Sequence, residues 1–433
     1  MARAVRRGTE DPRKARGRRV ERHIRRLFIG AVILVVLAII AAGVGFAYLR
    51  TSPAWGAIGL FEDGRRAESF RSMHELFPSR AVAAEGDVWS FGREERALPS
   101  SYVFEGEGRS LAAFLHDSET TSLLVVRGGV IVHESYGPGY DDRSLVTSFS
   151  VAKSFVSALV GIAIERGYVR SVDDAISEYV PALRGGAYDG VSIHDVLTMS
   201  SGVAFDEDYG SVRSDVMALP VRVYLYRQSV QTVLAGLGRE RAPGIVHEYV
   251  SSDAIALGLL ISHATGRSVS SFLEETVWRP AGMEAAAAWS TDLHGNELAH
   301  GFLGATLRDY ARFGRLYADG GRRDGDQVIP AEWVRASTTP AAPHLRPGEG
   351  RLESARFGYG YQWWLPPEPE GDFVAMGIWG QFVYVHPAAD VVIVKTSTDP
   401  MFETRFAESV AVFRAVVDDL ASGDQAQAAA GRP

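Results

Sequence analysis

The chain has 433 residues, 46% of them hydrophobic and 10% aromatic, enough apolar material for one large or two ordinary domains. It contains no cysteine, which excludes disulfides, thiolate metal sites, a cysteine nucleophile and a lipoprotein anchor. The whole chain carries −8 and its first 26 residues carry +8, so the remainder carries −16, a poor balance for binding nucleic acid.

The N-terminus joins a basic segment to a long apolar run. Residues 1–26 hold eleven Lys/Arg against three Asp/Glu, and residues 27–49 contain no charged side chain. An uncharged run of this length is typical of a transmembrane helix, and the basic flank of such a helix stays in the cytoplasm. We therefore expect a single-pass cell-membrane protein with everything after Arg50 outside the cytoplasm. The alternatives are a cleaved signal peptide, a twin-arginine signal at Arg25-Arg26 and a buried core helix.

Composition divides the rest of the chain into three parts, with no internal repeat. Residues 50–100 mix Gly, Pro, Arg and Glu with short apolar pieces, which indicates a linker passing into a covering segment. Residues 101–420 form the predicted main domain. Residues 421–433 are mostly small or polar, and we expect a disordered tail there.

Strand signals lie at both ends of the main domain. Two β-branched runs, 121–127 and 130–136, flank Gly128-Gly129 and predict a hairpin. Between residues 172 and 332 the pattern is mainly helical. Three short β-rich runs then follow, at 373–376, 382–385 and 391–396. This order predicts an α/β (α+β) fold with a central antiparallel sheet, flanking helices and an inserted α-rich lobe.

The segment 150–166 predicts a helix that is apolar nearly all round and therefore buried. Ser150 and Lys153 fall on one face of it, one turn apart. Lys153 is one of three lysines in a chain with 42 arginines, and lysine, unlike arginine, can lose its proton when buried. The pair therefore suggests a nucleophile beside a base. Alternatively, the arginine excess reflects a biased genome and the spacing is chance.

Several ordered motifs give the chain a resemblance to the serine β-lactamase and penicillin-binding-protein superfamily. It is most similar to the class C-type branch, and closest in pattern to the 6-aminohexanoate-dimer hydrolases. The resemblance covers roughly residues 100–420. The matching segments are 150–155 (the nucleophile motif), 193–202, 243–251 (the Tyr motif), 278–283, 307–314 and 359–364.

The third catalytic motif departs from the family pattern. Residues 375–380 align best with it, and Ala375 occupies the position of the family's Lys or His. Lys395-Thr396-Ser397 lacks the glycine of a K-T-G motif, so we interpret Lys395 as structural. The family's cation helps to hold a substrate carboxylate, and its loss argues against efficient penicillin hydrolysis or cell-wall transpeptidation.

The resemblance implies a serine β-lactamase-like fold and an acyl-transfer site. Ser150 would attack the carbonyl, Lys153 would accept the proton, and Tyr249 would relay it. Ser251, in place of the usual Asn, would hydrogen-bond within this network. The backbone amides of Ser150 and Ile378 would form the oxyanion hole.

Other polar residues form the predicted substrate side of the site. Asp206, Glu207 and Tyr209 resemble a family loop near the entrance, although an ordinary solvated acidic loop would look the same. Gly377 and Trp379 would line the acyl pocket, or Trp379 would simply pack.

The sequence therefore predicts a membrane-anchored serine hydrolase that cleaves small-molecule amides or esters. Two alternatives remain: a D-amino-acid peptidase or β-lactamase acting on envelope peptides, and a non-catalytic envelope-binding protein of the same fold. Neither a metal motif nor a nucleotide-binding fingerprint occurs, so we expect no cofactor.

Overall fold

The computed structural model describes residues 11–57, 59–348 and 356–430 of the 433. The chain divides into two compact units, Met1–Trp55 and Gly56–Pro433.

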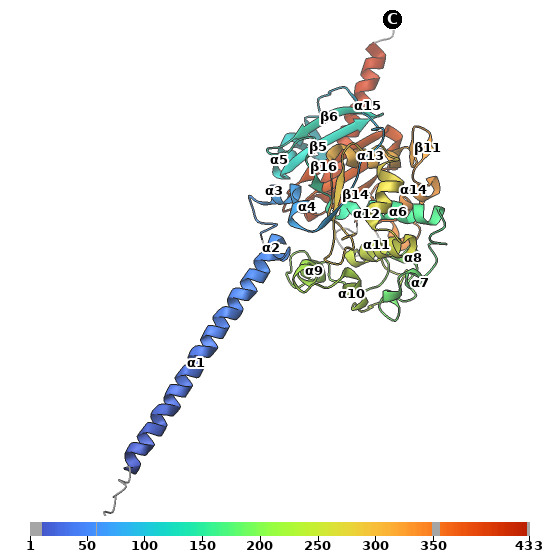
Figure 1. Cartoon of the computed structure of the whole chain (residues 1–433). Helices are drawn as coiled ribbons and strands as arrows, with labels where there is room; N and C mark the ends of the chain where they lie inside the picture. The colour runs from blue at the N-terminus through green and yellow to red at the C-terminus, as the bar shows by residue number, and fades with distance from the viewer. Residues whose placement is uncertain (1–10, 58, 349–355, 431–433) are drawn as a thin grey trace, which may run out of the picture. The chain divides into compact units, whose positions relative to one another are not determined.

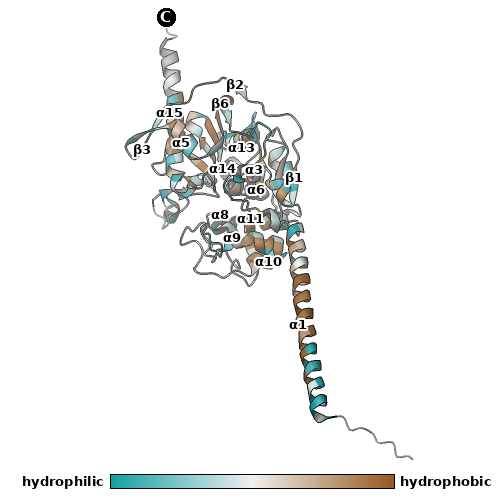
Figure 2. Ribbon diagram, turned by 90° about the vertical axis from the view of Figure 1, so that its left-hand side faces the viewer, coloured by the Kyte–Doolittle hydropathy of each residue, from teal (hydrophilic) through white to brown (hydrophobic). Residues whose placement is uncertain are grey.

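The first unit is dominated by the long helix α1 (Pro12–Thr51). Its start follows from the local sequence, because the Asp11 side chain accepts a hydrogen bond from the Arg13 amide and Pro12 occupies the first turn. Figure 2 shows a hydrophilic N-terminal portion followed by a hydrophobic stretch. The portion Arg16–Thr51 is exposed and is long and apolar enough to cross a membrane, a property that anchors and signal sequences share.

An eight-stranded sheet forms the centre of the second unit (Figure 1). The predicted hairpin is confirmed as β5 (Thr120–Arg127) and β6 (Val130–Tyr136), joined by two glycines with positive φ. The late strand β16 (Val391–Ser397) pairs antiparallel with β5, so the two ends of the domain meet in mid-sheet. The strand order is β12 (Gly358–Tyr359), β13 (Trp364–Leu365), β14 (Phe373–Gly377), β15 (Gln381–His386), β16, β5, β6 and β2 (Gly92–Arg93).

Three smaller sheets complete the strand set of the described residues. The middle of the chain, which we predicted as mainly helical, contributes strands to two of these sheets. These strands were not predicted, because short β runs between loops show little hydrophobic periodicity. The four-stranded sheet has the order β1 (Ser79–Val82), β8 (Ala287–Ser290), β9 (Leu303–Ala305) and β7 (Val146–Thr147). The two hairpins are β3 (Ser101–Phe104) with β4 (Glu107–Ser110), and β10 (Arg322–Arg323) with β11 (Asp326–Gln327).

Helices α13 (Leu307–Ala318) and α15 (Phe406–Ala430) cover opposite faces of the large sheet. A Cβ on Gly314 of α13 would lie 2.7 Å from Val392, so glycine permits the close approach there. On the other face Phe413 of α15 packs against Phe382 and Tyr384, with ring centroids 5.4 and 5.3 Å away.

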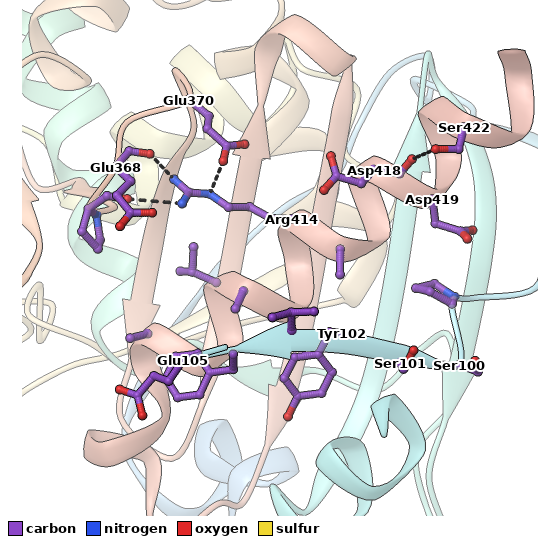
Figure 3. Close-up of a pocket in the computed structure, with 18 of the residues that line it drawn as sticks. Ser100, Ser101, Tyr102, Glu105, Glu368, Glu370, Arg414, Asp418, Asp419 and Ser422 are labelled. Atoms are coloured by element: carbon purple, nitrogen blue, oxygen red, sulfur yellow. Dashed lines mark hydrogen bonds and ion pairs between the residues drawn. The ribbon is translucent and has the colours of Figure 1, made fainter. Parts of the chain in front are cut away.

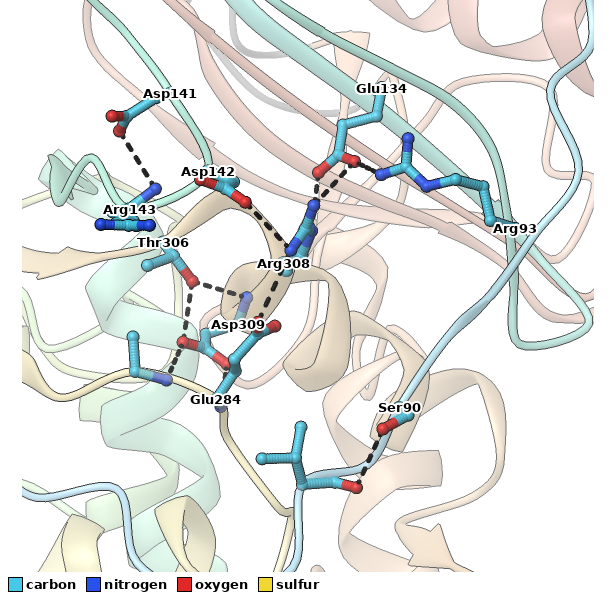
Figure 4. A network of polar contacts seen from close by, with 12 residues as sticks. Ser90, Arg93, Glu134, Asp141, Asp142, Arg143, Glu284, Thr306, Arg308 and Asp309 are labelled. Carbon is cyan, nitrogen blue, oxygen red and sulfur yellow. Dashed lines mark hydrogen bonds and ion pairs between the residues drawn. The ribbon is translucent and has the colours of Figure 1, made fainter.

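The start of α13 is fixed by a network of polar contacts (Figure 4). Thr306 caps the helix by accepting from the Asp309 amide, and Asp309 in turn accepts from the Glu284 amide at 2.7 Å. Arg308 donates to Glu134 of β6 at 2.7 and 3.0 Å, and Arg93 pairs with the same carboxylate. The network joins the start of α13 to β6 and β2 at one edge of the sheet.

The buried helix α6 (Ala152–Glu165) lies between the sheet layer and a helical lobe. Its Phe155 stacks on Phe313 of α13 at 3.6 Å between centroids, and its other side packs on α11 (Ser251–Thr265). Helices α7–α10 gather at the end of the unit away from β5 and β6 (Figures 1 and 2). The remaining helices are α2 (Ala54–Ala57), α3 (Arg66–Arg71), α4 (Met73–Leu76), α5 (Leu111–Asp117), α7 (Ile176–Tyr179), α8 (Ile193–Leu197), α9 (Asp215–Pro220), α10 (Val230–Ala235), α12 (Val269–Leu273) and α14 (Ala331–Ser337).

Helix α15 continues to Ala430, and residues 431–433 lie outside the described residues. The disordered tail that we expect for residues 421–433 stays a prediction. Alanine and glutamine dominate this stretch, and both have high helix propensity, which favours continuation of a helix already nucleated on the sheet.

Candidate active site

The proposed nucleophile lies on a short 3₁₀ turn (Phe149–Val151) that runs directly into α6. Lys153 occupies the first turn of α6, three residues after Ser150, and helical geometry brings the two side chains onto one face. Lys153 Nζ lies 2.8 Å from Ser150 Oγ. The structure therefore places the predicted nucleophile and base in direct contact.

The Lys153 amine is buried among acceptors. Lys153 is only 1% exposed. Its Nζ also lies 2.7 Å from the His300 carbonyl oxygen and 3.3 Å from Ser251 Oγ. Burial lowers the pKa of Lys153 to about 7, and the charge of Glu207 opposes part of that shift. A neutral amine has two protons, which suit the His300 carbonyl and Ser251, and one lone pair, which is left for the Ser150 hydroxyl.

Tyr249 lies next to Lys153 and precedes the start of α11 by two residues. Its ring stacks on Trp364 with centroids 5.2 Å apart, and Lys153 Nζ lies 4.9 Å from the ring centre. Burial, followed by the charge of Glu207, raises the pKa of Tyr249 well above its ordinary value, while a hydrogen bond with Ser150 lowers it in part. The phenol therefore keeps its proton near neutrality and is placed to donate it.

Glu207 is linked to Lys153 through Ser251, a connection that sequence reasoning missed. Its carboxylate accepts from the Ser251 amide at 2.7 Å, the Ser251 hydroxyl at 2.6 Å and the Tyr209 hydroxyl at 2.5 Å. Ser251 thus bridges Glu207 and Lys153. Glu207 and Tyr209, which we predicted as substrate-binding residues, belong to this network. The contact between Glu207 and Ser251 could not be predicted from the sequence, because the two residues are 44 positions apart and no motif spacing relates them.

The end of β14 approaches the nucleophile closely enough to require glycine. A Cβ on Gly377 would lie 2.6 Å from the Ser148 carbonyl oxygen and 3.2 Å from the Ser150 amide nitrogen. Ile378 follows and lines the same cavity as Ser150. Ala375, at the position of the family cation, is buried within β14. The assignment of the Ser150 and Ile378 amides to an oxyanion hole stays a prediction that this arrangement permits.

Trp379 and Lys395 lie outside the cavity as its described lining residues define it. The Trp379 ring instead stacks on Phe61, with centroids 5.4 Å apart and planes 15° apart, which corresponds to the packing alternative. Lys395 is buried on β16, where its Nζ lies 3.1 Å from Ser397 Oγ, and burial lowers its pKa to about 7. Lys395 therefore belongs to the sheet interior.

Ser150 and Tyr249 line a cavity of about 770 Å³. Apolar walls come from both the sheet side and the helical lobe, and among the described lining residues there is no lysine or arginine. The cavity is strongly acidic, with lining carboxylates from Asp206, Glu207, Asp208, Asp215, Glu240, Glu248 and Glu403. Such a surface favours neutral or positively charged ligands.

A second cavity, of about 800 Å³, lies between β3 and α15 (Figure 3). Arg414 is one of its lining residues. Its guanidinium donates to the Asp372 carboxylate at 2.9 Å and to the Glu368 carbonyl oxygen at 3.0 Å. None of Ser150, Lys153 and Tyr249 is among its described lining residues.

Comparison with known proteins decides the family. The pattern of the family described as Beta-lactamase matches residues 111–415. The chain belongs to the β-lactamase family. This β-lactamase-family chain is 30% identical over 360 residues to the 6-aminohexanoate-dimer hydrolase of Paenarthrobacter ureafaciens, covering 78% of this chain and 86% of that protein. It is 25% identical over 195 residues to the D-alanyl-D-alanine-carboxypeptidase/endopeptidase AmpH of Escherichia coli (strain K12), covering 43% of this chain and 47% of AmpH.

A solved structure gives the same result for the fold. The putative 6-aminohexanoate-dimer hydrolase from Bacillus anthracis superposes with a TM-score of 0.76 at 24% identity, covering 84% of this chain and 96% of that one. The predicted serine β-lactamase-like fold and the predicted resemblance to 6-aminohexanoate-dimer hydrolases are confirmed, and the chain is a serine hydrolase of this family.

Proposed function

We propose that the protein is a membrane-anchored serine hydrolase that cleaves small amides or esters through an acyl-enzyme on Ser150. The single observation that carries the proposal is the 2.8 Å contact between the Oγ of Ser150, which lines the acidic cavity, and the buried amine of Lys153. The Ser150 hydroxyl gives its proton to neutral Lys153 as Oγ attacks the carbonyl carbon. The Tyr249 phenol lies beside Ser150 and gives its proton to the leaving amine or alkoxide as the C–N or C–O bond breaks, and Lys153 passes the Ser150 proton on to the phenolate.

Deacylation reverses the roles. Water loses a proton to the same Lys153–Tyr249 pair as it attacks the acyl carbon, and Ser150 regains its hydroxyl. Glu207, acting through Ser251, holds the Lys153 amine in place and keeps its pKa from falling further. The backbone amides at Ser150 and Ile378 are the proposed donors to the oxyanion.

The test is covalent labelling of the chain from about residue 56 onward with a fluorophosphonate. We expect a single adduct by intact mass, on Ser150 by peptide mapping. A folded protein without an adduct would support the envelope-binding alternative. Turnover of D-alanyl-D-alanine peptides or cephalosporins, without turnover of simple esters and amides, would support the alternative of a peptidase or β-lactamase.

The acidic lining predicts a charge preference among substrates of equal length. For 6-aminohexanoyl, hexanoyl and adipoyl anilides we expect kcat/KM to fall in that order by about tenfold at each step at low salt. About 0.5 M NaCl should compress the series, because it screens the carboxylates. Equal rates for the amine and the acid would contradict the prediction.

The Lys153 pKa predicts the acid side of the pH profile. Acylation needs the neutral amine, so kcat/KM should fall about tenfold per pH unit below a midpoint near pH 7 and level off above it. Measuring ester hydrolysis from about pH 5 to 9 checks this. A flat profile across neutrality would exclude Lys153 as the titrating base.

Glu207 supplies a matched test of that assignment. Its negative charge raises the pKa of Lys153, so Glu207→Gln should shift the acid limb toward lower pH, in addition to lowering the rate through a weaker hold on Ser251. A shift toward higher pH would contradict the proposed electrostatic role.

For the N-terminal helix we propose a single-pass anchor with the basic end in the cytoplasm and the hydrolase domain outside. The asymmetry of charge around the apolar stretch supports this orientation. Retention in alkaline-washed membranes together with an intact N-terminal peptide by mass spectrometry is the expected result. Loss of the first residues in a soluble mature form would indicate a signal sequence.

A further inference from the structure

Three side chains near the start of the second unit contact Phe149 or Trp379, which are the chain neighbours of Ser150 and Ile378. Phe61 stacks on Trp379 with centroids 5.4 Å apart, and Arg66 places its guanidinium 4.8 Å from the same ring centre. Phe70 packs edge-on against Phe149 at 4.8 Å. We call Phe61, Arg66 and Phe70 the N-terminal clamp. They precede residue 111, where the family match begins.

Both residues under the clamp have strained backbones. Phe149 has a φ of 43° and Trp379 a φ of 61°, a left-handed conformation that is costly for bulky side chains. Phe149 directly precedes Ser150, and Trp379 directly follows Ile378. The orientation of the Ser150 amide depends on Phe149, and the turn that carries the Ile378 amide depends on Trp379. Such conformations persist only where the surroundings hold them.

The turn at Trp379 is held from two sides. On the sheet side, Ser397 Oγ lies 2.7 Å from the Trp379 carbonyl oxygen and 2.9 Å from that of Gly380. On the outer side, the clamp covers the Trp379 ring. Arg66 is itself fixed, because it donates to Glu119 at 3.2 Å, and Glu119 accepts from the Thr398 hydroxyl at 2.7 Å.

We propose that the N-terminal clamp is a positioning element for catalysis, which holds Phe149 and Trp379 so that the Ser150 and Ile378 amides point at the developing oxyanion. The inference rests on the proposed function. Loosening the clamp should misdirect these donors, whose interactions strengthen in the transition state, and should leave ground-state binding nearly intact. The rate of acylation should therefore fall while the apparent affinity for the reagent stays.

The chain offers a matched control within the same segment. Phe77 is 5% exposed and Phe70 1% exposed, but Phe77 stacks on Tyr224 in the helical lobe, at 4.9 Å, and not on a residue beside the nucleophile. Phe70→Ala and Phe77→Ala remove the same atoms from buried places, so both should lower the melting temperature. Phe61 is less buried and allows a milder pair, Phe61→Ala and Phe61→Tyr.

The experiment measures fluorophosphonate inactivation and hydrolysis of a short acyl ester by the full chain in detergent. We expect Phe61→Ala and Phe70→Ala to lower the maximal inactivation rate and kcat by about 10- to 100-fold, with KI and KM within about threefold of wild type. Phe61→Tyr keeps a stacked ring and should restore the rate, and Phe77→Ala should remain near wild type. The pH midpoint should not move, because the surroundings of Lys153 are unchanged.

Each other outcome overturns the proposal. Equal losses in Phe70→Ala and Phe77→Ala, or a loss carried by KM or by the pH midpoint, would show a general structural role. Normal kcat in Phe61→Ala would show that the clamp does not set the donors, whether or not Phe70→Ala folds. A wild-type protein that forms no adduct refutes the proposed function first and the clamp with it, which distinguishes the two failures.

Discussion

Replacing Lys153 with arginine should lower acylation of Ser150 by at least about 10³-fold. Arginine keeps its proton at any pH that the protein survives, so it offers no lone pair to the Ser150 hydroxyl. Its larger head group must also fit a site where Nζ now lies within 2.7–3.3 Å of three oxygen atoms. The rate of fluorophosphonate labelling, followed by intact mass, measures the loss.

The second buried lysine provides the control for Lys153. Burial lowers the pKa of Lys395 to about 7 as well, but its Nζ contacts Ser397 in the sheet and not the nucleophile. Lys153→Met and Lys395→Met both remove a buried amine and should both fold, since a buried amine costs desolvation energy. Only Lys153→Met should lose labelling. If Lys395→Met lost it equally, the contact between Lys153 and Ser150 would no longer explain the chemistry.

Replacing Tyr249 with phenylalanine should slow acylation by about 10²-fold or more, since it removes one proton-transfer group. The change deletes only the hydroxyl, because the aromatic ring that stacks on Trp364 remains. Burial keeps the phenol protonated, so the loss is that of a donor near Ser150 and the leaving group. Deacylation should slow too, and acyl-enzyme should then accumulate in mass spectra taken during turnover.

Tyr359→Phe is the matched control for Tyr249. Tyr359 is buried beside Tyr249, with centroids 6.3 Å apart, and its pKa is also raised mainly by burial. Tyr359 is not among the described residues that line the cavity, so its hydroxyl should be dispensable for acylation. Similar rates for Tyr249→Phe and wild type would remove Tyr249 from the mechanism.

Elements that rest on local pattern were predictable from the sequence. The hairpin of β5 and β6 follows from two β-branched runs around a Gly-Gly pair, and the buried helix that carries Lys153 follows from its apolar residues on all sides. Helical spacing alone puts Ser150 and Lys153 on one face, and the structure has them in contact.

Contacts between distant segments were not predictable in this way. The His300 carbonyl that accepts from Lys153 is a backbone group, which leaves no mark on residue type. Glu207 reaches Ser251 across 44 positions, and Phe61 reaches Trp379 from the other end of the domain. Such pairs depend on how the lobe and the sheet pack, and a single sequence contains no period or spacing that reports it.

The acidic lining of the cavity also bears on what happens after the bond is cut. Hydrolysis of either an amide or an ester releases a carboxylic acid, which is ionised at neutral pH. The new anion then stands among the carboxylates of Asp206, Asp208 and Asp215, and like charges repel. We therefore expect the acid to leave readily and to inhibit weakly, and we expect the reverse condensation to be disfavoured at the site.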